Sequence, residues 1–209
     1  YLKEKPEFLV PVPHHMKDIA ILLEPLSIVE KGIRQGWKMQ TARMPWKPRT
    51  ALVFGLGMIG ILAALVLKRK DLDVWLYSIE KTSDPKVEIL NELDIHYISA
   101  QEYSIAKLPN KIGSNLDFLF EATGNSTVVF KAMDIIGLNG MLCLSSVTGG
   151  TQTIKICSDC LNMELVLGNK AILGTVNANI IDFQQGLENL QFYHKQFPAL
   201  IQNLLPEHI

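Results

Sequence analysis

A glycine-rich turn between a strand-like run and a helix-like run is the feature that most limits the fold of this chain. Residues 55–60 read Gly-Leu-Gly-Met-Ile-Gly, a G-x-G-x-x-G pattern that follows the β-branched and aromatic run 50–54 and opens a helical run. At such a junction the first glycine permits a tight turn, the second lets the backbone approach a pyrophosphate, and the third lets helix and strand pack closely. The helix N-terminus would then offer free N–H groups to the phosphates, so the turn predicts a dinucleotide site.

The rest of the chain repeats this alternation of strand and helix. Runs rich in β-branched and aromatic residues predict strands at 50–54, 74–77, 95–98, 116–120, 141–144 and 171–176. Helical patterns fall between or after them at 58–70, 85–93, 126–136, 159–167 and 180–197. Strands joined through helices form right-handed βαβ units and a parallel sheet. We therefore expect an α/β fold, a Rossmann doubly wound parallel six-stranded sheet with helices on both faces.

The first fifty residues give a weaker pattern. An apolar run at 8–10 with prolines at 11 and 13 predicts an extended entry segment, because proline blocks a helix on either side. A short helical run is expected at 18–23, and a second helix from Glu24, with Pro25 in its first turn and an end near Gly36. Residues 38–49 hold basic residues and two prolines, so a loop is expected there.

Composition excludes several classes of protein. Hydrophobic residues make up 48% of the 209 residues, which excludes a disordered chain. Lysine and arginine number 20 against 21 acidic residues, so no bulk positive field is available for nucleic acid. The uncharged run 51–67 falls at the short edge of a membrane span and contains three glycines, so we interpret it as a buried strand that turns into a buried helix, not as a membrane segment. No secretory signal is visible, and three cysteines favour a reducing, cytoplasmic compartment.

Two other groups of residues suggest metal or redox chemistry only superficially. Cys157 and Cys160 form a C-x-x-C pair, but no second pair completes a four-sulfur site, and the pair belongs to a late helix. We therefore interpret the pair as a coincidence. His14 and His15 are neighbours in a predicted loop and would point apart, which favours a plain surface position.

The residue that reads the ribose is expected at the end of the second strand, about twenty residues after the first glycine. Neutral Ser78 lies at this tip, Glu80 comes two residues later and Lys81 follows. A serine hydroxyl can donate to a phosphate and Lys81 can offset its charge, whereas Glu80 would repel it. The strand tip therefore favours a phosphorylated ribose by a modest margin.

Four segments together resemble a known family. Residues 23–27 read Leu-Glu-Pro-Leu-Ser, residues 55–60 form the glycine turn, residues 121–124 read Glu-Ala-Thr-Gly, and residues 174–177 read Gly-Thr-Val-Asn. In this order they resemble the zinc-dependent medium-chain dehydrogenases, most closely the archaeal-type glucose (aldose) 1-dehydrogenase branch. The resemblance covers only the C-terminal, nucleotide-binding part of such an enzyme. It implies a Rossmann domain over 18–209, with 1–17 an extended segment left over from a preceding catalytic domain.

The resemblance also implies a set of site residues. Glu24 matches a glutamate that serves as a zinc or substrate ligand, and Asn177 an asparagine that reaches both sugar and nicotinamide. Ile28 departs from the acidic substrate residue of some relatives. With the strand-tip interpretation added, the predicted cofactor-binding residues are Gly55, Leu56, Gly57, Met58, Ile59, Gly60, Ser78, Lys81, Thr123, Ser145, Ser146, Val147, Thr175, Val176 and Asn177.

By this resemblance the full-length enzyme would use NADP (or NAD) and zinc to oxidise a sugar or polyol hydroxyl, and would form a homo-oligomer. One carboxylate cannot hold zinc, so this chain has no predicted catalytic residue of its own and is expected to be inactive alone. Two alternatives remain open from the residues themselves. One is a non-catalytic module that senses dinucleotides, and the other is a methyltransferase, which shares a similar first loop.

Overall fold

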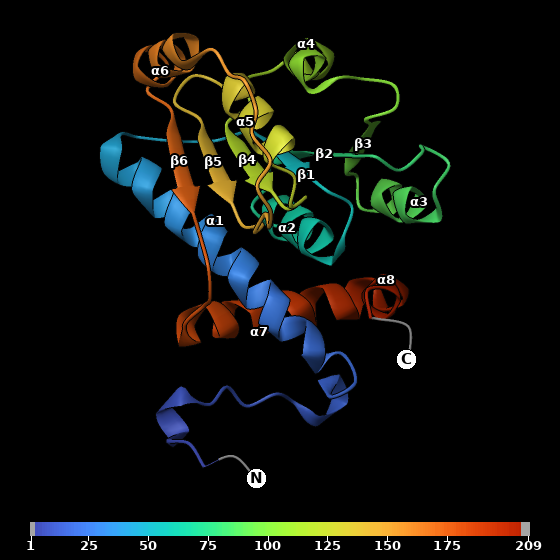
Figure 1. Ribbon diagram of the computed structural model, residues 1–209. Coiled ribbons are helices and arrows are strands. Elements are labelled where there is room, and N and C mark those ends of the chain that lie inside the picture. Colours follow the sequence, from blue (N-terminus) through green and yellow to red (C-terminus); the bar gives the residue numbers. More distant parts are fainter. Residues whose placement is uncertain (1–2, 206–209) are drawn as a thin grey trace.

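The computed structural model, which describes residues 3–205, is built around one six-stranded parallel sheet (Figure 1). The strand order is β3-β2-β1-β4-β5-β6, with parallel pairing at every neighbouring pair. The strands are β1 (Thr50–Phe54), β2 (Asp73–Ser78), β3 (His96–Ser99), β4 (Phe118–Glu121), β5 (Met141–Leu144) and β6 (Ala171–Gly174). The predicted doubly wound Rossmann sheet is confirmed.

Helices cover both faces of this sheet. They are α1 (Leu23–Arg43), α2 (Met58–Lys68), α3 (Pro85–Glu92), α4 (Leu108–Ile112), α5 (Ser126–Ile135), α6 (Ser158–Leu167), α7 (Ile180–Gln196) and α8 (Pro198–Asn203). The short α4 was not predicted from the sequence. Among residues 3–205, no helix combines the length and apolarity that crossing a bilayer would require.

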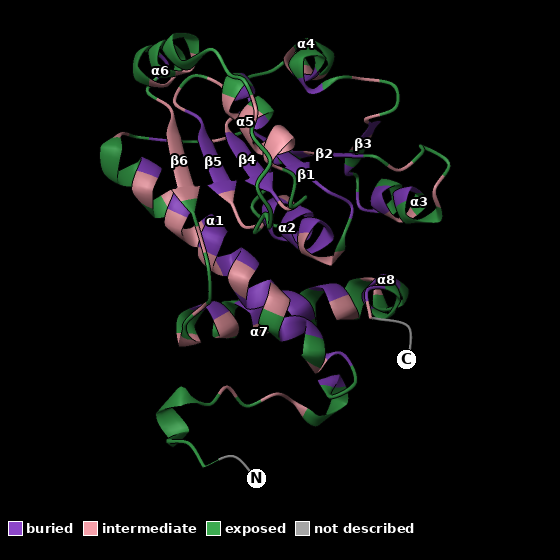
Figure 2. Ribbon diagram, in the orientation of Figure 1, coloured by how far each residue is buried: buried purple, intermediate pink, exposed green. Residues whose placement is uncertain are grey.

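Each central strand sends alternate side chains into two separate cores. On β1, Ala51 and Val53 pack on the face covered by α1, α2 and α7, while Leu52 and Phe54 pack on the face covered by α4 and α5. This alternation follows from the two-residue period of a strand. Figure 2 shows β1, β4 and β5 buried, whereas β6 at the edge is only half-buried. Because both faces are covered, the central strands are apolar at nearly every position.

The first long helix differs from the prediction. Instead of ending near Gly36, α1 continues to Arg43, so residues 38–43 are helical and not a loop. Gly36 does not end the helix, because it lies where α1 crosses the sheet closely. A Cβ at this position would lie 3.1 Å from the ring of Phe118, and one at Gly32 would lie 2.9 Å from Sγ of Cys143. The two glycines therefore let α1 approach β4 and β5.

The segment before α1 is also more structured than an extended chain. Two short 3-10 turns, Pro6–Phe8 and His14–Met16, interrupt it, and a third covers Ala20–Leu22. Residues 3–9 are exposed and lie away from the sheet in Figure 2, whereas the side chain of Met16 is buried in the core. His14 and His15 are exposed, as expected. Residues 1 and 2 of the predicted entry segment lie outside the described residues.

Glu30 on α1 is a buried carboxyl that no basic side chain of residues 3–205 contacts by a hydrogen bond. Its side chain accepts a hydrogen bond from Nδ2 of Asn189 on α7, whose Oδ1 has no partner among the described residues. Burial raises the pKa of Glu30 to about 7; the Asn189 hydrogen bond and the charges of Lys70 and Arg69 oppose the rise, and Asp182 adds to it. The carboxylate form is therefore costly in the folded protein.

A Glu30→Gln variant is expected to gain stability over the parent as the pH rises. The ordinary pKa of 4.5 applies to the unfolded chain and about 7 to the folded one, so the folded state loses stability as pH rises through this window. The gap sets a limit of about 3 kcal/mol, and nearly all of it is reached at pH 8, one unit above the pKa of the folded state. Urea unfolding at pH 4 and pH 8 measures it, with exposed Glu92→Gln as the control. An equal effect of Glu30→Gln at both pH values would contradict the assignment.

Candidate dinucleotide site

A cavity of about 600 Å³ lies at the carboxyl ends of β1, β2 and β4. This is where the chain switches from one face of the sheet to the other, since β1 is followed by α2 on one face and β4 by α5 on the other. Ligands of doubly wound sheets bind in the crevice at such a switch point. The lining residues are Gly55, Leu56, Gly57, Tyr77, Ser78, Ile79, Glu80, Ala100, Ser104, Ile105, Ala122, Thr123, Asn125, Thr127, Val128 and Lys131.

The three glycines of the turn meet three different demands. Gly55 has a φ of +106°, and a Cβ there would lie 3.0 Å from the carbonyl oxygen of Ala122. At Gly60 a Cβ would lie only 1.9 Å from the carbonyl oxygen of Gly55, so the start of α2 packs directly on the turn. At Gly57 a Cβ would meet no atom of the described residues within 4 Å, its two chain neighbours aside. The first and third glycines are therefore required by the fold, whereas the second leaves open space at the cavity.

The N-terminus of α2 lies at this open space, because Gly57 directly precedes the helix. Gly57 is the N-cap, and no side chain of the described residues caps the helix. The first N–H groups of a helix have no partner within the helix, and the helix dipole gives this end a partial positive charge. The turn thus provides a backbone cradle for a phosphate group.

Ser78 at the tip of β2 holds the turn in place. It is 8% exposed, and its Oγ accepts a hydrogen bond of 3.1 Å from the N–H of Leu56. The backbone N–H of Gly55 in turn donates to the carbonyl oxygen of Tyr77 on β2. The acceptor role of Ser78 is thus taken up by the turn, while its own O–H remains available as a donor at the cavity.

Glu80 projects from a backbone that is tied firmly to β3. Its carbonyl oxygen accepts hydrogen bonds from the hydroxyl of Tyr97 at 2.8 Å and from that of Ser99 at 2.7 Å. Glu80 is one of the residues that line the cavity, and its Oε2 is buried without a hydrogen-bond partner among residues 3–205. A negatively charged group therefore borders the cavity beside Ser78.

Glu121 connects the loops after β4 and β5. It belongs to the Glu-Ala-Thr-Gly segment of the sequence but was not predicted as a site residue. Its carboxylate is fully buried and accepts hydrogen bonds from the N–H of Thr123 at 2.7 Å, from the hydroxyl of Thr123, and from the hydroxyl of Ser146. Ser145 also donates from its hydroxyl to the carbonyl oxygen of Glu121, at 2.9 Å. This buried clamp holds Thr123 at the cavity and fixes the start of the loop that carries Val147.

The predicted cofactor residues fall into two groups. Gly55, Leu56, Gly57, Ser78 and Thr123 line the cavity itself. The other group lies outside its lining and comprises Met58, Ile59 and Gly60 in α2, the exposed Lys81, the clamp residues Ser145 and Ser146, exposed Val147, and Thr175, Val176 and Asn177 after β6. The structure thus brings the turn, the second strand and the fourth strand together at the cavity, and the segments after β5 and β6 are not among its lining residues.

The segment after β6 is held in place by α1. Nζ of Lys31 donates to the carbonyl oxygen of Val176 at 2.6 Å, and Asn177 adopts a φ of +60°, which asparagine tolerates better than most residues. Asn179 then caps α7 in a capping box with Asp182. The side chain of Asp182 also forms an ion pair with Arg34, whose Nε lies 2.7 Å from Oδ1.

Sequence reasoning missed the wall of the cavity formed by α5. Asn125 caps this helix through its side chain, and Thr127, Val128 and Lys131 line the cavity from the first turns. The position of α5 in the chain could have indicated this wall, because a helix that follows the fourth strand must begin at the switch point. Lys131 therefore provides a cation on the α5 wall of the same cavity that Glu80 borders.

Glu24 lies at a second cavity, away from the turn. This cavity measures about 700 Å³ and is lined by the N-terminal segment, the start of α1 and the start of α7, including Ile21, Asn179 and Phe183. Within the described part of the chain, no three His, Cys, Asp or Glu residues gather closely enough to hold a metal ion. Glu24 could supply one ligand or substrate contact, but the described residues do not complete a zinc site.

Comparison with known proteins gives one consistent result. A protein-family model described as "Glucose dehydrogenase C-terminus" matches residues 17–208. A glucose 1-dehydrogenase of Methanocella arvoryzae is 40% identical over 209 residues, which cover all of this chain and 58% of that relative. A glucose 1-dehydrogenase of Vulcanisaeta moutnovskia is 35% identical over 191 residues, or 91% of this chain and 53% of the relative.

A solved structure agrees in fold over the same region. The glucose dehydrogenase of Haloferax mediterranei, solved in complex with NADP, zinc and gluconolactone, matches with a TM-score of 0.86 at 26% identity. The match covers 94% of this chain and 55% of that structure. The chain therefore spans little more than half the length of the relatives it matches.

Proposed function

Because this chain belongs to the glucose dehydrogenase family, of which it carries the C-terminal region, we propose that it is the nucleotide-binding domain of an NAD(P)-dependent oxidoreductase. The enzyme would oxidise a sugar or polyol hydroxyl. The observation that carries the proposal is the open space at Gly57, at the N-terminus of α2 and inside the switch-point cavity. A packing turn would need no such space, whereas a pyrophosphate does.

The residues of the cavity would bind and orient the dinucleotide. The N–H groups at the start of α2 would hold the pyrophosphate, and Thr123 and the loop from Ser145, fixed by Glu121, would border the nicotinamide. The dinucleotide itself supplies the hydride acceptor. The chain's contribution is therefore position: rigid strand ends and a buried carboxylate clamp set where the dinucleotide lies relative to a substrate.

We propose NADP as the preferred cofactor, with NAD as the alternative. Ser78 places a neutral hydroxyl at the tip of β2, and Lys131 on α5 and Lys81 nearby supply positive charge for a 2′-phosphate. Glu80 is the carboxylate at the cavity that opposes this choice. The NADP found with the Haloferax mediterranei enzyme supports the same preference.

Removal of the charge at Glu80 tests this preference. A Glu80→Gln variant is expected to bind NADP about fivefold more tightly and NAD within about twofold of the parent, since a partly screened like charge costs about 1 kcal/mol. Titration calorimetry with both dinucleotides measures the effect. Glu88→Gln removes the same charge from an exposed position of α3 and serves as the control. If the variant instead loses NAD binding tenfold and gains none for NADP, Glu80 binds the ribose hydroxyls.

We propose that most of the zinc ligands lie outside this chain, since the described residues contain no group of three that could hold a metal ion. Zinc in the longer enzyme would be held mainly by a preceding catalytic domain, with Glu24 contributing a ligand or a substrate contact beside its cavity and Asn177 reaching the substrate. Residues 1–17 would form the end of that preceding domain. A dehydrogenase assay on the 209-residue chain with glucose, NADP and zinc should therefore give no turnover. Steady oxidation of glucose would contradict the proposal that most zinc ligands lie in another domain.

We also propose that the protein self-associates and that it is located in the cytoplasm. β6 is an edge strand whose outer backbone is open to pairing, and the apolar side chains of Val166 and Leu167 on the adjacent α6 are exposed. These features support a homo-oligomer, which sedimentation of the chain would reveal. The small number of cysteines supports a reducing compartment.

A further inference from the structure

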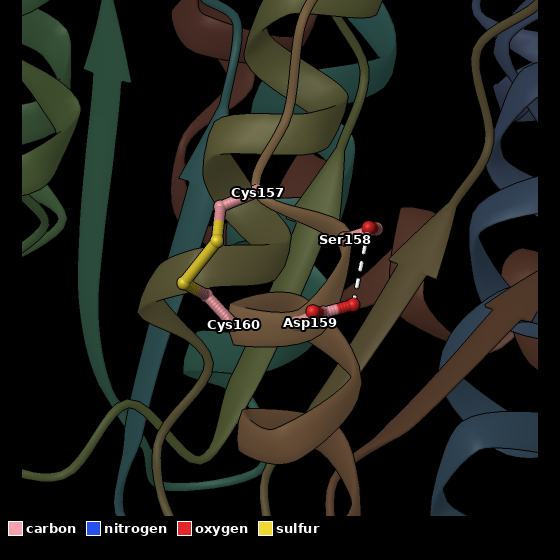
Figure 3. Close-up of a disulfide and its surroundings, with 4 residues drawn as sticks. All are labelled: Cys157, Ser158, Asp159 and Cys160. Atoms are coloured by element: carbon pink, nitrogen blue, oxygen red, sulfur yellow. Dashed lines mark hydrogen bonds between the residues drawn. A yellow bond between two sulfur atoms is a disulfide. The ribbon is translucent and has the colours of Figure 1, made fainter.

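Cys157 and Cys160 are joined by a disulfide at the first turn of α6 (Figure 3). Their Cα atoms lie 5.3 Å apart, a separation typical of disulfides. Both residues are exposed, whereas the third cysteine, Cys143, is buried in β5. The pair therefore has a geometry that closes a bond and an exposure that lets a reagent reach it, which the sequence pattern alone did not show.

The two sulfurs occupy unequal positions on the helix. Cys157 is the N-cap of α6, and no side-chain hydrogen bond caps that end of the helix among the described residues. Free N–H groups and the helix dipole at this end stabilise a thiolate, and Lys155 adds a nearby positive charge along the chain. Asp159 in the first turn opposes this effect. Cys160 is the third residue of the helix itself, one turn further from the N-cap position.

The bond is poorly suited to a purely structural role. It closes a loop of only four residues, so it restricts the unfolded chain far less than a disulfide between distant residues would. It also anchors a helix with no buried residue, so little packing depends on it. The cavity at the glycine turn is lined by other segments, which places the pair outside the dinucleotide site.

We propose that Cys157 and Cys160 form a reversible dithiol–disulfide couple that exchanges with external dithiols and disulfides. In the reducing direction, a thiolate of an external dithiol attacks Sγ of Cys157, and Cys160 leaves as a thiolate that takes a proton from water. The second thiol of the reductant, as its thiolate, then attacks the mixed disulfide and releases the Cys157 thiolate at the helix N-terminus. That attack is on the reductant's own sulfur, so the external dithiol becomes a disulfide and two electrons pass to the protein, which ends with a Cys160 thiol and a Cys157 thiolate. The two protons of the reductant's thiols go to solvent, and solvent returns one of them to Cys160.

Redox titration of the folded 209-residue chain tests the couple. The chain is equilibrated with mixtures of reduced and oxidised dithiothreitol, quenched with a maleimide and analysed by peptide mass spectrometry. A tenfold change in the ratio of oxidised to reduced reagent should change the ratio of disulfide to dithiol tenfold at both Cys157 and Cys160. Burial raises the pKa of Cys143 to about 12, so this thiol should stay unlabelled throughout and serve as the internal control.

Two variants, each lacking one cysteine of the pair, test whether Cys157 and Cys160 differ in reactivity. With oxidised glutathione, Cys160→Ser should gain one glutathione on Cys157 at least tenfold faster than Cys157→Ser gains one on Cys160. Circular dichroism should be unchanged in both, because α6 buries no side chain. The proposal would be overturned if excess dithiothreitol failed to reduce the disulfide in the folded chain, or if oxidised dithiothreitol failed to re-form it. Equal rates of glutathione addition at the two positions would also overturn it.

Discussion

A Gly57→Val variant is expected to fold as the parent does and to lose at least about 100-fold in affinity for nicotinamide dinucleotides. The backbone at Gly57 has φ −80° and ψ 177°, an extended conformation open to valine, and apart from its chain neighbours no atom of the described residues lies within 4 Å of an added Cβ. The fold should therefore lose only the weaker capping of valine, about 1 kcal/mol. The side chain would fill the space that we assign to the pyrophosphate.

Calorimetric titration with NADP and NAD, beside thermal unfolding of the same preparation, measures both effects of Gly57→Val. Gly57→Ala provides a graded comparison, since a methyl group fills less of the space and should weaken binding less. A folded Gly57→Val protein with unchanged affinity would show that the turn serves packing alone.

Gly60→Ala is expected to have the opposite profile, with a loss of at least about 3 kcal/mol of stability. The added Cβ would meet the carbonyl oxygen of Gly55 at 1.9 Å and its carbonyl carbon at 2.9 Å. Both atoms belong to the backbone, so α2 must move away from the turn. That movement would open the contact between α2 and β1 on which the apolar side chains of α2 depend, Leu62 and Val66 among them.

Urea unfolding measures the Gly60→Ala effect, and Gly57→Ala is its matched control because the same methyl group enters open space three residues earlier. The two alanine variants should differ by at least about 2 kcal/mol. Equal stability of the two would mean that α2 is not packed on the turn as described.

The core of the fold could be predicted from sequence because its signals are local. β1 is a buried β-branched and aromatic run ended by glycine, and β5 was placed at Met141–Leu144 with both ends correct. The extension of α1 past Gly36 could not be predicted in this way. Its glycines reflect contact with Phe118 and Cys143, far away in the sequence, and a glycine required for close packing looks the same as one that ends a helix.

The same distinction between local signals and tertiary contacts applies to the residues of the site. The glycine turn was found because its spacing encodes its conformation, whereas the roles of Glu121 and Glu80 depend on tertiary contacts. Glu121 reads as one more strand residue until Ser146 from the next loop is brought to its carboxylate. Glu80 follows an exposed Ile79, and only the hydrogen bonds from Tyr97 and Ser99 fix its place at the cavity.

The most direct test of the central claim is titration of the 209-residue chain with NADP, NAD and S-adenosylmethionine in the same buffer. We expect saturable binding of one nicotinamide dinucleotide per chain, NADP at least as tight as NAD, and no saturable binding of S-adenosylmethionine. Tighter binding of S-adenosylmethionine, or no saturable binding of either dinucleotide, would contradict the claim.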